Sequence, residues 1–280
     1  MVSIQEVRRY WESHPLLSYE SEGEVGTPEY FELLATAKRE DSDRFAEAYW
    51  NFGGYSGKRV LDVGCGPGYL TVEYARRGAI VSSVDLTEAA VEITRKHLAY
   101  RNCLADVRVG NAEDLPFPER SFDMVFSSGV LHHTPDTLRA FRECYRVLRP
   151  GGEAKITLYR KNLLLHPLFF NVTRAVMRLA AVKHPGADLA RTSQDPDTFI
   201  RQYDGAENPV GIGKTNRDWA RDLANCGFQI QGWENHFFPK RFLPAASFVP
   251  RFMHYFLDRR LGTMVYFRLL KPKGVGGGSV

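Results

Sequence analysis

The sequence predicts an α/β fold in which a parallel sheet carries helices on both faces. Between residues 58 and 159, short apolar runs alternate with segments of helical periodicity, as expected for parallel strands joined by right-handed crossovers. The first apolar run ends in Asp62 and a glycine-rich turn at residues 64–68, which predicts a buried strand breaking into a tight turn. A chain of 280 residues is long enough to bury a sizeable core.

Local signals place the elements of this region. The predicted strands are residues 59–63, 79–84, 106–109, 122–126 and 153–158. The helix that begins at residue 69 ends at Gly78, which suits a left-handed cap, and the next helix begins after Thr87, a favourable N-cap. Residues 138–148 carry one apolar helical face and end before Pro150.

The alternation stops after Tyr159 and resumes at Thr215, where a helix and two further strands (228–233 and 263–270) are predicted. The chain is therefore expected to comprise an N-terminal cap segment (1–57), a core (58–159), an insertion or lid (160–214), the end of the core (215–270) with a second insertion (235–262), and a flexible tail (271–280).

Four segments in a fixed order point to a family. A dinucleotide fingerprint would need glycine at position 69, where Tyr69 stands. The glycine turn instead resembles motif I of the class I S-adenosylmethionine-dependent methyltransferases, and of the type 11 methyltransferase domain in particular. The later segments that share this resemblance are Asp85, residues 110–117, and residues 121–133 followed by 147–152.

The resemblance implies a Rossmann-like, seven-stranded, mostly parallel sheet of order 3-2-1-4-5-7-6 with an antiparallel seventh strand. It implies that the N-terminal segment and the insertions after strands 5 and 6 form a cap. It also implies an enzyme that uses S-adenosylmethionine, without a metal, and transfers a methyl group to an O, N or S atom of a small molecule by in-line displacement.

The resemblance also assigns cofactor contacts. Gly64 and Gly66 would face the methionine part, and Asp85 would accept hydrogen bonds from the ribose. Asn111 stands where the family often has Asp, and its amide oxygen offers the adenine amine the same acceptor without the charge. For Gly68, turn geometry alone and direct contact are equally expected. The full set of expected cofactor residues is Asp62, Gly64, Cys65, Gly66, Gly68, Asp85, Leu86, Asn111, Ala112, Glu113 and Ser128.

His132 and His133 follow the fourth strand, where the acceptor meets the methyl group in this family. Imidazole titrates near neutrality and suits a general base. The alternative is that the pair simply begins the next helix. Of the two, His132 is the preferred catalytic residue.

Aromatic and polar side chains outside the core are the expected substrate-binding residues. A ring near a sulfonium gives a cation–π attraction, although ordinary packing of a cap is the preferred explanation for any one of them. Residues 202–209 combine polar groups with turn formers, as binding loops do. The expected residues are Tyr10, Tyr19, Tyr159, Tyr203 and Asn208, with Trp11 beside them.

The charge is uneven along the chain. Residues 1–57 hold 5 basic and 11 acidic residues, whereas residues 160–280 hold 18 basic and 9 acidic ones. This pattern fits two separate solvated faces, or an acidic N-terminal segment docked on a basic cap. The apolar and basic residues 167–182, 237–242 and 251–260 fit a lid packed on the core, or contact with a membrane surface and a lipid or quinone acceptor.

A tRNA or RNA methyltransferase is the alternative function, and the acidic N-terminal segment counts against nucleic acid as a partner. No run of about 18 apolar residues predicts a spanning helix, and the N-terminus lacks the pattern of a signal peptide. The four cysteines form no CxxC pair. A cytoplasmic enzyme is therefore expected, with peripheral membrane contact left open.

Overall fold

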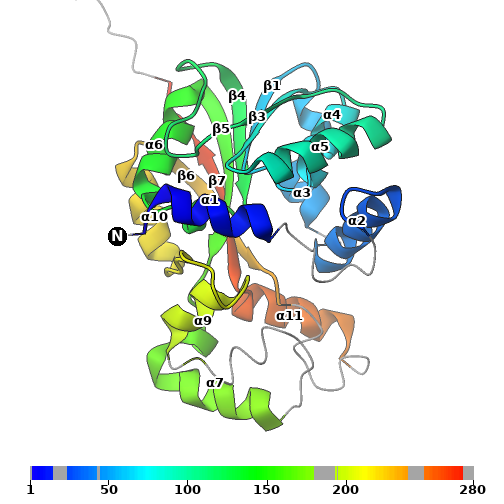
Figure 1. Ribbon diagram of the computed structural model, residues 1–280. Helices are drawn as coiled ribbons and strands as arrows, with labels where there is room; N and C mark the ends of the chain where they lie inside the picture. The colour runs from blue at the N-terminus through cyan, green and yellow to red at the C-terminus, as the bar shows by residue number, and fades with distance from the viewer. Residues whose placement is uncertain are drawn as a thin grey trace, which may run out of the picture.

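The computed structural model describes residues 2–14, 24–42, 45–179, 193, 195–238 and 249–273. At its centre is a 7-stranded sheet of order β3-β2-β1-β4-β5-β7-β6 (Figure 1). The strands are β1 Arg59–Val63, β2 Ile80–Asp85, β3 Asp106–Val109, β4 Phe122–Ser128, β5 Leu148–Tyr159, β6 Gln229–His236 and β7 Met264–Leu270. All pairs among β1 to β5 are parallel, and β7 runs antiparallel to both β5 and β6. The strand order and the antiparallel seventh strand implied by the resemblance are confirmed.

Helices and short 3₁₀ turns connect and cover the strands. In the N-terminal half they are α1 Ile4–Ser13, α2 Pro28–Ser42, α3 Ala46–Trp50, η1 Phe52–Tyr55, α4 Tyr69–Arg76, α5 Glu88–Tyr100, η2 Leu131–His133 and α6 Thr137–Val147. In the C-terminal half they are η3 Leu163–Leu165, α7 Pro167–Leu179, α9 Pro196–Gln202, α10 Asn216–Asn225 and α11 Arg251–Leu261. Thr87 and Thr215 cap α5 and α10 through their hydroxyl groups, as their positions before apolar periodic segments predict.

Strand β5 begins earlier than the sequence predicts. Leu148 already pairs with Phe122, and the register shifts before Met124 pairs with Glu153. The sequence Pro150-Gly151-Gly152 carries the signal of a turn, but here it lies within an irregular first part of the strand. Tertiary pairing with β4 therefore overrides the local turn preference.

The core has two sides because successive strand residues face opposite surfaces of the sheet. Leu61 and Val125 pack with α6 and α10, whose Trp219 is fully buried. Val60 and Met124 pack on the other surface, with α3, η1 and α4. Burial of both faces explains why the central strands are continuous apolar runs.

The N-terminal segment meets the C-terminal part of the chain through rings and backbone groups. The Tyr49 hydroxyl donates to the Phe267 carbonyl at 2.8 Å, and the Phe45 ring stacks on His236. The buried Lys155 ammonium donates to the Trp50 carbonyl at 2.6 Å, and burial lowers the pKa of Lys155 to about 8. Within the described ranges no ion pair joins residues 1–57 to residues 160–280, so docking by opposite charge is not what the structure shows.

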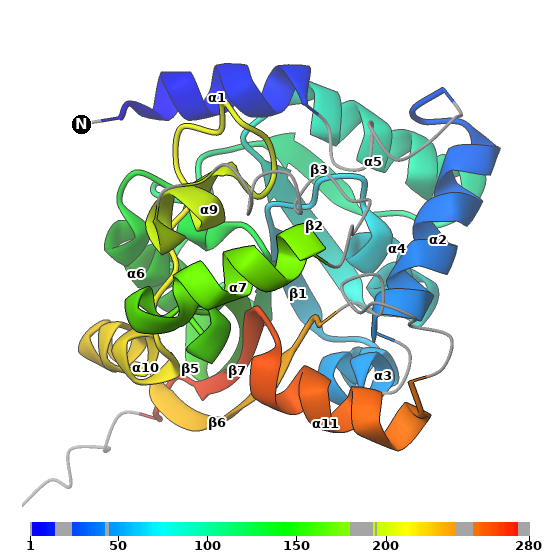
Figure 2. The ribbon, with the colours of Figure 1, turned by 90° about the horizontal axis from the view of Figure 1, so that it is seen from below.

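The insertion after β5 lies beyond the carboxyl edge of the sheet. Figure 1 shows α7 and α9 below the strands, and Figure 2, seen from below, shows both helices in front of the sheet with α1 along one side. Leu165, Phe170, Phe199 and Ile200 form the buried cluster of this insertion, against which Tyr159 packs. The insertion therefore rests on the end of β5.

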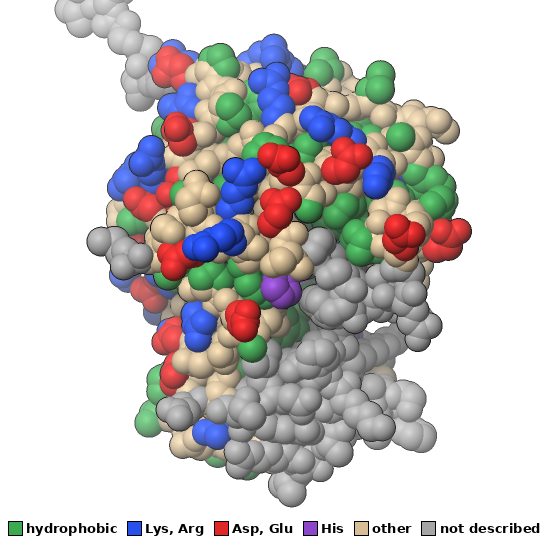
Figure 3. Space-filling view, in the orientation of Figure 1, with side chains coloured by type: hydrophobic (Ala, Val, Ile, Leu, Met, Phe, Trp, Pro, Cys, Tyr) green, Lys and Arg blue, Asp and Glu red, His purple; other side chains and the backbone are tan. Residues whose placement is uncertain are grey.

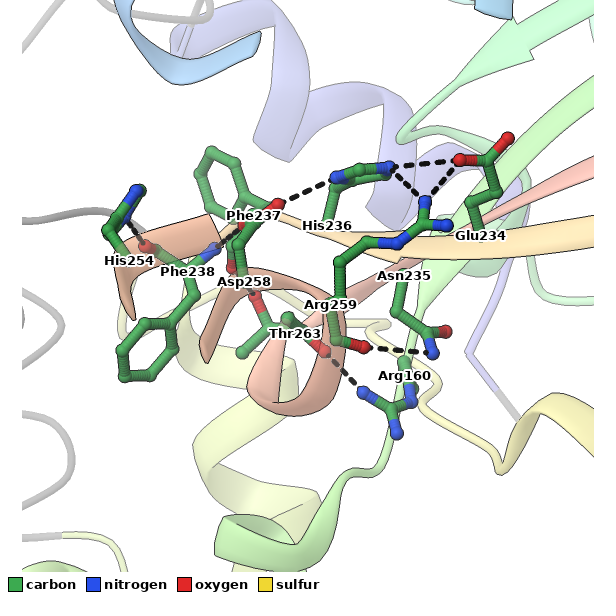
Figure 4. Close-up of polar contacts among 11 residues, drawn as sticks. Arg160, Glu234, Asn235, His236, Phe237, Phe238, His254, Asp258, Arg259 and Thr263 are labelled. Atoms are coloured by element: carbon green, nitrogen blue, oxygen red, sulfur yellow. Dashed lines mark hydrogen bonds and ion pairs between the residues drawn. The ribbon is translucent and has the colours of Figure 1, made fainter. Parts of the chain in front are cut away.

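A buried polar cluster fixes α11 to the end of β6 (Figure 4). The His236 ring is 1% exposed, and its Nδ1 lies 2.6 Å from the Asp258 carboxylate. The other oxygen of Asp258 accepts from the Phe238 amide at 2.8 Å, and His254 contacts the Phe238 carbonyl at 2.8 Å. His254 and Asp258 lie one turn apart, so this face of α11 is turned to the sheet. None of the described helices has the length and apolarity needed to cross a membrane.

Candidate active site

An open pocket of about 1150 Å³, mouth included, lies at the carboxyl edge of β1, β2 and β4. This edge is where ligands bind in doubly wound sheets. Among its lining residues are Asp62, Gly64, Cys65, Gly66, Asp85, Leu86, Asn111, Ala112 and Ser128 from the strand ends, with Val130, His133 and Thr134 beyond β4.

The glycine turn forms one wall of the pocket. A Cβ added to Gly64 would lie 2.4 Å from the Val130 side chain, so packing against the loop after β4 requires glycine there. At Gly66, φ is 51° and an added Cβ would meet no atom within 4 Å. The backbone of Gly66 therefore borders open space and is accessible to a ligand. Gly68 does not line the pocket; it is the N-cap of α4.

Two buried carboxylates lie beside this turn. Asp62 accepts a hydrogen bond from the Thr71 hydroxyl at 2.7 Å, and burial together with the charge of Asp85 raises the pKa of Asp62 to about 7. Asp85 accepts from the Gly66 and Thr87 amides, each at 3.0 Å, and burial raises the pKa of Asp85 as well. In the described part of the chain neither acid forms an ion pair with Lys or Arg.

This donor set fits a positively charged ligand. Two buried acids with raised pKa values and, in the described part of the chain, no basic partner make a site that a cation would stabilise. The cofactor implied by the sequence carries both an ammonium and a sulfonium group. No group of three metal-ligating side chains occurs among the residues the structure describes.

The loop after β3 forms the opposite end of the pocket. The Asn111 side-chain oxygen accepts from the Glu113 amide at 3.0 Å, so Asn111 both lines the pocket and holds its own turn. Glu113 is outside the lining. Its carboxylate accepts from the Asp136 amide at 2.8 Å and thus joins this loop to the start of α6.

The two adjacent histidines occupy different environments. His132 is fully buried, does not line the pocket, and has no hydrogen-bond partner at either ring nitrogen among the described residues. Burial, with the charge of His133, lowers the pKa of His132 well below its usual range, so this ring is neutral. His133 lines the pocket. The placement favours His133 over His132, the reverse of the preference drawn from the sequence.

His133 is held by the insertion. Its Nδ1 lies 2.6 Å from the Val210 carbonyl oxygen, which can only accept, so the proton of a neutral ring sits on Nδ1. Its Nε2 lies 3.2 Å from Oδ2 of Asp204. The same oxygen accepts a hydrogen bond from the Tyr159 hydroxyl at 2.5 Å. The buried Asn208 amide lies 3.4 Å from Nδ1.

Helix α1 covers the pocket from the side. Ile4, Val7 and Trp11 belong to the lining, and the Trp11 ring lies edge-on to His133 with centroids 5.2 Å apart. The Glu12 carboxylate accepts from the Glu88 and Ala89 amides at the N-terminus of α5, at 3.1 and 2.9 Å. This contact places negative charge at the positive end of a helix and fixes the end of α1.

Nine of the eleven expected cofactor residues line the pocket, and Gly68 and Glu113 do not. The expected substrate residues Tyr10, Tyr159, Tyr203 and Asn208 are outside the lining. They surround His133 and Asp204 instead, as the contacts of Tyr10 with Asp204 and of Tyr159 with His133 and Tyr203 illustrate. Tyr19 lies outside the described residues.

Sequence reasoning named Trp11 of α1 but missed Asp204 and the other pocket residues of that helix, Ile4 and Val7. Asp204 lies inside the polar segment 202–209 that the sequence singled out, but its partner His133 is distant in the chain. Helix α1 begins with a capping box of Ser3 and Glu6, a signal the sequence does carry. That signal predicts a helix, not the surface on which the helix packs.

The raised pKa of Asp62 predicts a pH-dependent stability. The folded chain keeps this proton up to about pH 7, whereas the unfolded chain releases it near 4. Stability should therefore fall as the pH rises from about 4 to about 7. We expect Asp62→Asn to flatten this fall and to raise the free energy of unfolding at pH 8 by at most about 4 kcal/mol. Urea denaturation across this pH range measures the effect. Asp106→Asn, at an exposed ion pair, is the control and should leave the curve unchanged; an Asp62→Asn curve parallel to wild type would contradict the assignment.

Comparison with known proteins agrees with this geometry. Residues 61–156 match the family described as Methyltransferase domain. The ubiquinone biosynthesis O-methyltransferase of Pseudomonas savastanoi pv. phaseolicola is 37% identical over 180 residues, which cover 64% of this chain and 67% of that protein. The protein of the same name from Pseudomonas fluorescens is 37% identical over 167 residues, which cover 59% of this chain and 68% of that protein.

Solved structures share the fold. An S-adenosylmethionine-dependent methyltransferase from Mesorhizobium loti has a TM-score of 0.54 at 21% identity, over 81% of this chain and 99% of that chain. The cyclase SpnF has a TM-score of 0.53 at 19% identity, over 90% of this chain and 86% of that chain. A cyclase on the same fold means that fold alone does not give the reaction. The domain match and the sequence relatives identify the reaction as methyl transfer. This chain belongs to the class I S-adenosylmethionine-dependent methyltransferases.

Proposed function

We propose that this methyltransferase acts on a hydroxyl group of a small aromatic molecule, with His133 as the base that accepts the hydroxyl proton. The observation that carries the proposal is the position of His133. Among the described residues, it is the histidine that lines the pocket, and it follows β4. A base of this kind is useful for an O–H acceptor, whose proton must leave during the reaction.

The cofactor would lie along the strand ends. Asp62 and the backbone at Gly64 and Gly66 are the proposed partners of its methionine part, with the Ser128 carbonyl nearby. Asp85 is the proposed partner of the ribose, and Leu86, Asn111 and Ala112 of the adenine. When bound, S-adenosylmethionine supplies a methyl group on a positively charged sulfur. The protein holds the cofactor through these residues, and α1 shields the pocket from water.

His133 is set up to take a proton at one defined atom. Because Nδ1–H donates to the Val210 carbonyl, the basic lone pair of the neutral ring is on Nε2. The acceptor hydroxyl would take the place of the Asp204 carboxylate, which lies 3.2 Å from Nε2. The acceptor's O–H bond would then break as the Nε2–H bond forms, and the imidazolium would afterwards release the proton to solvent. His132 is less suited, since its ring is outside the pocket lining and burial, which lowers its pKa, disfavours the protonated form that a base must become.

An aromatic acceptor suits the surroundings of His133, which include the rings of Trp11 and Tyr159. The sequence relatives named above are O-methyltransferases of ubiquinone biosynthesis, which supports a hydroxyaromatic related to quinones. RNA is the alternative acceptor. Figure 3 shows basic and acidic side chains interspersed over the described part of one face, which does not favour a nucleic-acid surface there.

A screen with methyl-labelled cofactor tests the acceptor class. We expect label to pass to catechols and other phenols, with little transfer to amines or thiols of similar size. Total tRNA should stay at background, because basic and acidic side chains are interspersed on the described part of the face in Figure 3. Salt-sensitive labelling of tRNA, without labelling of any phenol, would overturn the proposal.

Substitution of His133 tests the base. With a phenolic acceptor, His133→Gln should lower kcat at least about tenfold, because general bases contribute about 10² to 10⁴ in rate. Cofactor affinity should change little, and the loss should shrink at high pH, where the acceptor ionises by itself. His132→Phe, which keeps an aromatic ring against Tyr159, is the matched control and should stay within a few-fold of wild type. Equal pH–rate profiles for wild type and His133→Gln would eliminate His133 as the base.

We also propose peripheral contact of this enzyme with an anionic membrane surface through α7 and α11. Large apolar side chains are exposed on both helices: Leu168 79%, Phe169 47%, Val172 61%, Phe252 77%, Tyr255 48% and Phe256 57%. The opposite face of α11 is fixed to the sheet through Asp258 (Figure 4). The sequence of α7 has two arginines and no acid, and that of α11 has three arginines and one acid. Apolar side chains bordered by arginine are typical of helices that lie in a lipid interface. The four free cysteines support the cytoplasmic side as the place of contact.

Vesicle flotation tests this contact. The protein should float with phosphatidylglycerol vesicles and much less with phosphatidylcholine vesicles, and salt should weaken the binding. The double variant Leu168→Gln and Phe252→Gln should reduce the bound fraction several-fold. Leu104→Gln, at a side chain that is 92% exposed in the loop before β3, is the control and should bind like wild type. Failure of the wild-type protein to float, or self-association that depends on Phe252 without lipid, would contradict the proposal.

A further inference from the structure

We infer that the acceptor carries a carboxylate group and that Lys38 of α2 binds this group. The inference rests on the proposed function, a hydroxyaromatic acceptor, and narrows that class to hydroxyaromatic acids. It follows from the parts of the chain that supply the pocket lining and from the side chains that each part brings to it.

The pocket lining divides at the boundary of the methyltransferase domain. From Asp62 to Thr134 the lining residues lie within residues 61–156, the part of the chain that matches the domain. All residues that are proposed to hold the cofactor belong to this matching part. Among the described residues, the lining residues outside it are Ile4, Val7, Trp11 and Lys38. We therefore assign these outer residues to the acceptor, since the reaction partner of a shared fold is recognised by what is added to it.

The outer residues indicate the chemistry of the ligand that they suit. Three of them are apolar side chains on one face of α1, and the indole of Trp11 is the largest. The fourth, Lys38, is the lysine or arginine of the described pocket lining. Asp62 and Asp85 bring negative charge from the ends of β1 and β2, so positive charge enters the pocket from α2. An aromatic ring that carries an anionic group fits this combination.

Helix α2 fixes the position from which Lys38 reaches the pocket. The buried Phe31 ring stacks on His97 of α5, with ring centroids 4.2 Å apart. Leu34, one turn further along α2, is 1% exposed. Lys38 follows Phe31 by two turns and is partly buried, so it lies on the same inward face of the helix. The Lys38 side chain is therefore presented to the pocket by a helix that is packed on the core.

Helix α1, which supplies the apolar side chains, is held by the loop after α9. The Tyr10 hydroxyl donates to the Asp204 backbone carbonyl at 2.6 Å. A Cβ at Gly205 would lie 2.0 Å from the Tyr10 hydroxyl oxygen, so this close approach requires glycine. The Trp11 ring meets Tyr10 edge-on, with centroids 5.2 Å apart. The aromatic ring and the cation of the outer lining thus come from two helices that are each fixed in place.

The cofactor also has a carboxylate, and the structure favours the acceptor as the partner of Lys38. The residues proposed for the methionine part of the cofactor belong to β1 and to the glycine turn that follows it. Lys38 belongs to the N-terminal segment, as does Trp11, whose ring meets the proposed base His133. The cation is therefore grouped by its place in the chain with the side chains that surround the acceptor.

Binding of hydroxybenzoates and of their methyl esters tests the inference without turnover. Saturating S-adenosylhomocysteine fills the cofactor site in these titrations and has no methyl group to transfer. Near neutral pH the acids are ionised and the esters are uncharged. The wild-type protein should bind an acid at least about tenfold more tightly than its ester, because a hydrogen bond between charged groups is stronger than one to a neutral group.

Substitution of Lys38 assigns this preference to one side chain. Lys38→Met, which keeps a long side chain without the charge, should bind acids and esters equally, and Lys38→Arg should retain most of the preference for acids. Lys96→Met, at an exposed lysine of α5 outside the pocket lining, is the matched control and should bind like wild type. Failure of the wild type to prefer acids, or a preference that persists in Lys38→Met, would overturn the inference while leaving phenol methylation intact.

Cofactor binding separates the two sources of the carboxylate. Lys38→Met should bind S-adenosylmethionine and its decarboxylated form with the same ratio of affinities as wild type. A loss confined to S-adenosylmethionine would assign Lys38 to the cofactor and overturn the inference. Hydroxybenzoates bound through Lys38 by a protein that transfers label only to amines or thiols would instead reject the proposed function and retain the carboxylate site.

Discussion

The parallel pairing of β1 with both β2 and β4 is the constraint on which the site depends. Because the three strands run in the same direction, their carboxyl ends reach the same edge of the sheet. The chain leaves β1 toward β2 and later returns to β4 on the other side, which opens a crevice at the end of β1. Asp62, Asp85 and Ser128 meet there from three strands. Packing of Val130 against Gly64 holds the loop after β4 close to the turn after β1.

The sequence predicts the fold well because its signals are local. Apolar runs, caps and glycine turns lie within a few residues of the structure they specify, and the cofactor side chains follow directly after strands. The contact of Asp204 with His133 has no such signal, since an acid in a polar loop looks the same whether or not it meets a distant ring. The predicted start of β5 is wrong for the opposite reason. Pro150 and its glycines carry a local signal for a turn, but pairing with β4 extends the strand through them.

One buried acid, Asp62, and two partly buried ones, Asp204 and Asp258, are compensated in different ways for the loss of solvent. Asp258 is matched by His236 and by a backbone amide, and it serves to anchor α11. Asp204 is matched by one ring and one hydroxyl, with that ring at the pocket wall. Asp62 has one hydroxyl and a like-charged neighbour, and its pKa rises accordingly. Incomplete compensation of this kind is typical of groups that await a ligand.

The two parts of the pocket differ in how strongly the rest of the fold constrains their sequence. The strand ends that would hold the methyl donor belong to the sheet, where one altered residue disturbs several strands at once. The parts around His133 come from α1 and from the loop after α9, which contact each other through Tyr10 and Asp204 and contact α5 and His133 at Glu12 and Asp204. A duplicated gene could therefore exchange or lengthen these outer segments by recombination and keep the donor site unchanged. On this view the choice of acceptor can change in evolution while the donor site is kept. Any exchanged segment must still preserve the close contact between Gly205 and the first helix.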